Sequence, residues 1–169
     1  MLFVYTLLRL IHIFAGVFWA GANLLMAFYI SPSVKATAPE SGKFMQYLAQ
    51  KSGFPKMAEL SGWLTILAGI ALFWVVSGGF QPEWFTTHRG MVLTIGGLLA
   101  IAGFVVGFVM QKPAAKKLGH VGQEIQAAGG PPSPEQLAQI QAQQAKLAKG
   151  GRWTAILLAL SVAFMAISR

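Results

Sequence analysis

The chain contains four apolar runs, and their lengths constrain its fold more than any other feature of the sequence. They cover residues 2–30, 60–77, 91–110 and 153–167. A helix needs roughly 20 apolar residues to cross about 30 Å of hydrocarbon, so each run is a candidate transmembrane helix. The sequence therefore predicts an all-α integral membrane bundle of four transmembrane helices, with residues 1–169 forming a single transmembrane domain.

Composition supports this assignment and excludes several kinds of chemistry. The chain is 55% hydrophobic and only 11% charged, which is too apolar for a soluble domain. It has no cysteine, which excludes disulfides, thiolate metal sites, iron–sulfur clusters and c-type haem attachment. It has no aspartate and only five scattered glutamates, so neither a catalytic carboxylate pair nor a nucleophile with an adjacent base is evident.

The basic residues predict the orientation of the chain. Ten of the thirteen lysines and arginines lie in the two long loops, residues 31–59 and 111–152. Because positive loops stay in the cytoplasm, we expect a multi-pass protein of the inner (cytoplasmic) membrane with both termini on the non-cytoplasmic side. The same residues would contact anionic lipids at the cytoplasmic face. They form no basic stripe interleaved with exposed aromatic residues, so nucleic acid is not an expected partner.

Both loops carry signals for further helices. Thr37-Ala38-Pro39-Glu40 has the form of a capping box, and the apolar spacing after it predicts a short interfacial helix. Ser133-Pro134-Glu135-Gln136 has the same form. Because Gly129-Gly130-Pro131-Pro132 breaks the chain before it, residues 113–150 are expected to form a cytoplasmic helical hairpin.

The third apolar run carries a face of small residues: Gly96, Ala100, Gly103 and Gly107. Such a face lets a second helix approach closely, which is the main way in which helices associate in lipid. Packing within the chain is the favoured interpretation, and a dimer interface is the alternative.

His12 is the principal candidate for a functional residue. It lies inside the first apolar run, where an ionisable side chain is costly unless it has a partner. Trp19 shares its helix face, and the small residue Gly16 lies between them. An imidazole above small residues, with an aromatic ring nearby, suits a flat macrocycle such as haem b. In the plainer alternative, His12 hydrogen-bonds a carbonyl or a water molecule across the bundle, and Trp19 and Gly21 are packing residues.

His88 is a second candidate. It opens the third run, which has the same direction as the first, so His12 and His88 both lie toward the non-cytoplasmic face. Two imidazoles on facing helices can hold a haem iron or a copper ion, which makes both histidines candidate metal ligands. An interfacial His88 exposed to water, or one that caps its helix, is the alternative.

The pattern His12-x6-Trp19-x-Gly21, followed by Pro32, resembles two kinds of membrane protein. One comprises the copper-resistance-D-type proteins and related small four-helix membrane families. The other comprises the HemJ-type protoporphyrinogen oxidases, and that resemblance implies a haem ligand at His12. The likeness covers about thirty residues.

Three hypotheses about function follow. The first is a membrane protein that binds haem b for electron transfer or haem handling, with His12 as axial ligand and a quinone as a possible electron partner. The second is a non-enzymatic accessory subunit of a larger respiratory or photosynthetic membrane complex, which would bind other membrane subunits. The third is a copper-handling membrane protein.

Overall fold

The computed structural model describes residues 2–38 and 40–168, and every regular element in this part of the chain is helical. Four helical segments are long and apolar enough to cross a membrane, as the sequence predicts. The chain is therefore an all-α, multi-pass membrane bundle. The elements in chain order are α1 (Leu2–Leu25), η1 (Met26–Ile30), α2 (Ser31–Ala36), α3 (Gly42–Gln50), α4 (Phe54–Val76), α5 (Pro82–Phe85), α6 (His88–Val106), η2 (Gly107–Gln111), α7 (Lys112–Ala128) and α8 (Pro134–Ala166).

The helices extend well beyond the four predicted apolar runs. The first continues to Ala36, the second begins at Phe54, and the third continues through η2 and α7 to Ala128. The fourth begins at Pro134, nineteen residues before the predicted span. Hydropathy detects only the apolar part of a helix, which lies in the hydrocarbon of the bilayer. When a helix continues into a polar sequence, the apolar run therefore underestimates the length of the helix.

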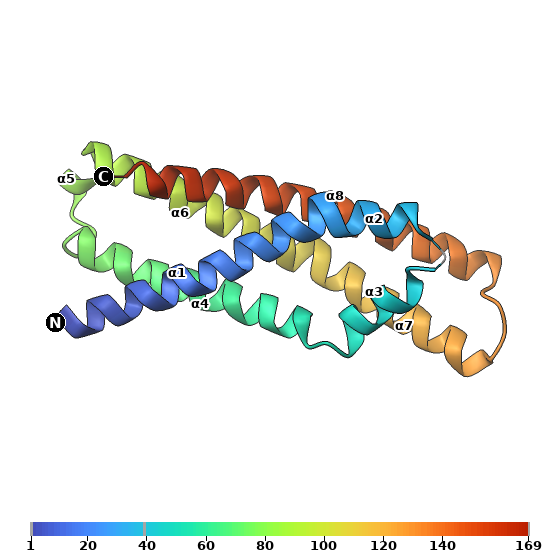
Figure 1. Ribbon diagram of the computed structural model, residues 1–169. Coiled ribbons are helices and arrows are strands. Elements are labelled where there is room, and N and C mark those ends of the chain that lie inside the picture. The colour runs from blue at the N-terminus through green and yellow to red at the C-terminus, as the bar shows by residue number, and fades with distance from the viewer. Residues whose placement is uncertain (1, 39, 169) are drawn as a thin grey trace.

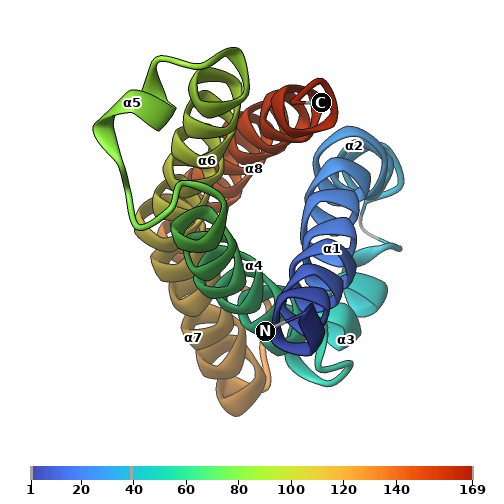
Figure 2. The same ribbon diagram turned by 90° about the vertical axis from the view of Figure 1, so that its left-hand side faces the viewer.

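The bundle is built from two helix pairs. Helix α1 packs mainly against α4, and α6 packs mainly against α8. The two termini lie at the same end of the molecule, and the turn between α7 and α8 lies at the other (Figure 1). We call these the terminal end and the hairpin end. Figure 2 looks along the bundle from the terminal end and shows α4 between α1 and α6.

The small-residue face of α6 packs within the chain, which confirms the favoured interpretation. Gly96, Ala100 and Gly103 are buried against α8. At Gly96 the helices are so close that a Cβ atom would lie 3.3 Å from the carbonyl oxygen of Ser161. The hydroxyl of Ser161 donates to the Gly96 carbonyl over 2.7 Å, and that of Thr154 donates to Gly103 over 3.3 Å. Close packing and interhelical hydrogen bonds thus join α6 to α8.

Large apolar side chains cover the outside of the bundle. Phe14 and Val17 on α1, for example, are 73% and 70% exposed. The core is small by comparison and centres on Trp19, Ala20 and Leu158. Lipid is the solvent that makes such a surface favourable.

Two π-helical turns, η1 and η2, interrupt the first and third long helices. Each is followed within two residues by a proline, Pro32 and Pro113 respectively. A proline ring clashes with the carbonyl four residues earlier in an α-helix, and the wider π turn relieves that clash. This explains why Pro113 does not end its helix, so that α7 continues the third span.

The two loops contain the expected helices, with one correction. The interfacial helix α3 begins at Gly42 after the N-cap Ser41, so a capping box at Thr37 is wrong; the Thr37 hydroxyl instead donates to the Ser33 carbonyl. Pro39, inside the predicted box, lies outside the described residues. The helical hairpin of α7 and the first part of α8 is confirmed.

The capping box at the start of α8 is also confirmed. The Ser133 hydroxyl accepts from the Gln136 amide, and the Gln136 side chain accepts from the Ser133 amide. A hydrogen bond from the Ser133 hydroxyl lowers the pKa of Glu135, so this carboxylate stays charged at the positive end of the helix dipole.

Candidate functional site

His12 lies against the middle of α4, where it contacts Thr65 and Gly69. Its Nδ1 atom is 2.8 Å from the carbonyl oxygen of Thr65. A carbonyl can only accept, so Nδ1 carries the hydrogen and donates it. The imidazole fits there because residue 69 is glycine: a Cβ atom at Gly69 would lie 2.9 Å from the His12 Cε1 atom. Because Gly69 follows Thr65 by one turn of α4, the His12 ring finds a hydrogen-bond acceptor at Thr65 and enough space beside Gly69.

The other ring nitrogen of His12 has no hydrogen-bond partner among residues 2–38 and 40–168. It is not completely buried, because within that part of the chain every fully buried side-chain nitrogen or oxygen has a partner, and His12 as a whole is partly exposed. In a neutral imidazole whose Nδ1 donates, Nε2 carries the lone pair. A backbone carbonyl on one nitrogen is the usual arrangement for a histidine that binds a metal through the other.

Gly16 and Trp19 are both engaged in helix packing. A Cβ atom at Gly16 would lie 3.4 Å from the Thr65 methyl group, so this glycine brings α1 close to α4. Trp19 is 7% exposed, and its ring lies 5.8 Å from that of Phe104 in an edge-to-face arrangement. The structure therefore gives both residues a packing role, which for Trp19 is the role that the plainer interpretation expects. Their contact with a macrocycle stays a prediction.

His88 lies at a different depth from His12. The contact between Trp19 and Phe104 sets the relative position of α1 and α6. At 1.5 Å per residue, His12 is about 10 Å from Trp19 and His88 about 24 Å from Phe104, both toward the terminal end. The two histidines are therefore separated by about 13 Å along the bundle. His88 is exposed at the start of α6, where Thr87 rather than His88 is the N-cap. The role of His88 as a second metal or haem ligand stays a prediction, and the separation of the two histidines along the bundle does not support it.

The described residues hold no group of three or more histidine, cysteine, aspartate or glutamate side chains placed to bind a metal ion. His120, the third histidine, is exposed on α7. A copper site would thus depend on His12 together with groups of another kind. Copper binding stays a prediction without a ligand set.

A large cavity opens in the hairpin half of the bundle, between α1, α3, α4, the third long helix and α8. Its volume is about 340 Å³, and most of its wall is apolar. Trp19 lies on this wall, whereas none of the three histidines does. Sequence reasoning did not find this cavity, because its walls come from five segments whose relative placement no local pattern encodes.

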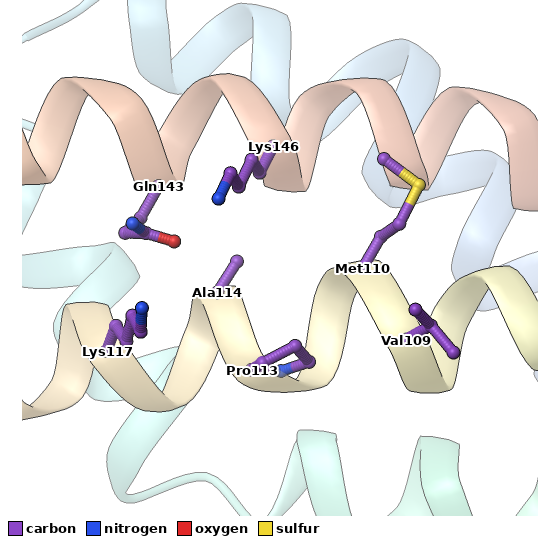
Figure 3. Close-up of a pocket in the computed structure, with 7 residues that line it drawn as sticks. All are labelled: Val109, Met110, Pro113, Ala114, Lys117, Gln143 and Lys146. Carbon is purple, nitrogen blue, oxygen red and sulfur yellow. The ribbon is translucent and has the colours of Figure 1, made fainter.

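A smaller cavity of about 220 Å³ lies between the arms of the hairpin (Figure 3). Lys117 from α7 and Lys146 from α8 both point into the space between these helices, with Gln143 beside them. Met110 and Val109 form its apolar end. Two exposed ammonium groups next to an apolar surface suit the head groups of anionic lipids.

No protein-family model, no curated protein and no solved structure matches the chain. The resemblance to copper-resistance-D-type and HemJ-type proteins therefore stays a prediction based on the first helix.

Proposed function

We propose that this chain is a membrane protein that binds haem b through Nε2 of His12. The observation that carries the proposal is the hydrogen bond from Nδ1 to the Thr65 carbonyl. It fixes the tautomer and the direction of the imidazole, and it leaves a lone pair on Nε2. When bound, haem b would supply a one-electron couple within the membrane.

The residues around His12 would keep the ligand rigid. Gly69 gives the ring its space, and Gly16 lets Thr65 approach α1 closely enough to accept the hydrogen bond. The Thr65 hydroxyl donates to the Ser61 carbonyl over 2.7 Å, which holds its methyl group toward Gly16. These contacts come from α1 and α4 alone, the two helices that share the most extensive contact in the bundle.

We also propose the orientation of the bundle, with the hairpin end in the cytoplasm of a cell whose inner membrane holds the protein. The excess of lysine and arginine in residues 31–59 and 111–152 supports it. Lys117 and Lys146, whose side chains both point into the space between the arms of the hairpin, would contact anionic lipid head groups in this orientation.

The test is an optical spectrum of the full chain, purified in detergent from bacterial membranes supplied with a haem precursor. We expect a Soret band and nearly equimolar haem b in the wild type and in His88→Ala, and only background haem in His12→Ala. A wild type without a chromophore that co-purifies with other membrane subunits would contradict the proposal and favour the accessory-subunit hypothesis.

A further inference from the structure

The large cavity in the hairpin half is a separate site from His12. It begins beside Trp19, about two helical turns from the histidine, and continues toward Glu59 and Lys112 at its polar end. At about 340 Å³ it falls in the size range of small-molecule sites. Any inference about its ligand therefore stands independently of haem binding.

The wall of this cavity contains four aromatic rings. Trp19, Phe54, Phe104 and Phe108 line it from three helical segments. Phe104 and Phe108 lie nearly parallel, with centroids 6.4 Å apart and an angle of 19° between the rings. Aromatic walls favour a flat conjugated ring over a flexible acyl chain, because stacked and edge contacts add to simple burial.

The π turn η2 contributes to the same wall. Three of its five residues, Gly107, Phe108 and Gln111, line the cavity. Gly107 leaves the space open, since a Cβ atom there would meet only Gln111 and Thr154, at 3.5 and 4.0 Å. Pro113 explains why a π turn occurs here, and single π turns within helices are frequent at functional sites.

The polar groups at the cavity's end favour a neutral ligand with hydrogen-bond acceptors. The Gln111 side-chain amide donates one hydrogen to the Thr154 hydroxyl over 2.9 Å and has a second hydrogen to offer. The Lys112 ammonium pairs with Glu59 and lies 4.8 Å from the centre of the Phe108 ring. It has further hydrogens to donate, but the Glu59 carboxylate beside it would repel an anionic head group.

We propose that this cavity binds a lipid-soluble quinone. The flat ring lies against the aromatic wall, one of its carbonyl oxygens accepts from Gln111 or Lys112, and its apolar tail extends toward the lipid. A phospholipid fits less well, because its phosphate would meet Glu59 and its acyl chains make no use of the aromatic rings.

Photolabelling of the full chain in detergent tests the proposal. The probe is a quinone that carries an azido group on its ring and a short alkyl tail. After illumination we expect label in peptides that contain residues 19–26 and 103–115, and we expect unlabelled decylubiquinone to compete. Ala58→Phe, which fills the cavity from α4, should reduce labelling about tenfold or more. Gln111→Leu, which removes a donor while the apolar wall remains, should reduce it by a smaller factor.

Ala102→Phe is the matched control, because Ala102 is exposed on α6 and does not line the cavity. It should label like the wild type. If Ala58→Phe fails to give a monodisperse helical protein, Ala22→Phe fills the same cavity from α1. The proposal is overturned if the cavity-filling variants label like Ala102→Phe, or if a saturated phospholipid competes as well as decylubiquinone. None of these outcomes depends on haem, so a chain without haem can still bind the quinone.

Discussion

At the scale of single residues, the sequence singles out His12, and the plainer interpretation expects it to hydrogen-bond a carbonyl across the bundle, as the structure shows, but the sequence does not identify which carbonyl. Its position inside an apolar run is enough to mark it, because an unpartnered imidazole is costly there. Its partner, the Thr65 carbonyl, is a backbone group that any residue type would supply. The identity of that partner depends on the register between α1 and α4, which no local pattern contains. Gly69 was the missed signal, since a glycine inside a span often marks a close approach.

Gly69→Ala tests whether the space beside Gly69 that holds the His12 ring affects haem affinity. The new Cβ atom would lie 2.9 Å from Cε1 and 3.1 Å from Nδ1, so the ring must move and its bond to Thr65 weakens. Outer-shell changes at metal ligands typically cost about tenfold or more in affinity, and we expect haem affinity to fall by about that factor. The measurement is haem titration of the purified variant. Gly97→Ala is the control, because a Cβ atom at Gly97 meets nothing within 4 Å. Equal affinity in the two variants would rule out the role given to Gly69.

At the scale of secondary-structure elements, periodicity and capping signals predict most of the helices. The Ser133 box and the small-residue face of α6 are both local patterns, and both are confirmed. The interfacial helix is correct in kind, but its start is wrong by several residues, because Ser41 rather than Thr37 precedes it. The two π turns were not predicted. A proline in the sequence predicts that a helix ends near it. That each of these helices instead continues past its proline depends on the packing of the whole bundle.

The turn between α5 and α6 depends on Gly90. A Cβ atom at this position would lie much too close to the backbone carbonyl of Trp84, so any side chain forces the backbone to shift. We expect Gly90→Ala to destabilise the protein by about 2 kcal/mol, as overpacking usually does. Gly97→Ala, in the same helix but without a close neighbour, should keep or raise the stability, since alanine favours the helix. Thermal unfolding in detergent, followed by circular dichroism, compares the two. A midpoint for Gly90→Ala as high as that of Gly97→Ala would refute this explanation.

At the scale of the whole molecule, the four apolar runs together with the composition predict an all-α membrane bundle, and the structure confirms it. The sequence did not predict which transmembrane helices pack against each other. Four apolar helices can associate in several ways, and the observed pairs, α1 with α4 and α6 with α8, depend on complementary surfaces. The cavity forms only when the helices pair in this way. Because its lining residues come from five segments, no local sequence motif predicts it.

The orientation of the bundle can be tested directly because the chain contains no cysteine. Gln81 precedes α5 at the terminal end, and Gln141 is exposed on the hairpin arm of α8. In spheroplasts, a membrane-impermeant maleimide should label Gln81→Cys from outside and Gln141→Cys only after permeabilisation, because positive loops remain in the cytoplasm. The reverse pattern would show that the hairpin faces outward.

The most direct test of the central claim replaces the His12 side chain with a free ligand. His12→Gly removes the imidazole and leaves a hole in front of Thr65 and Gly69 that free imidazole can enter. We predict that the purified variant lacks the Soret band and regains it when haem and imidazole are added together, whereas haem alone does not restore it. A His12→Gly variant that keeps the haem content of the wild type would contradict the assignment of His12 as the ligand.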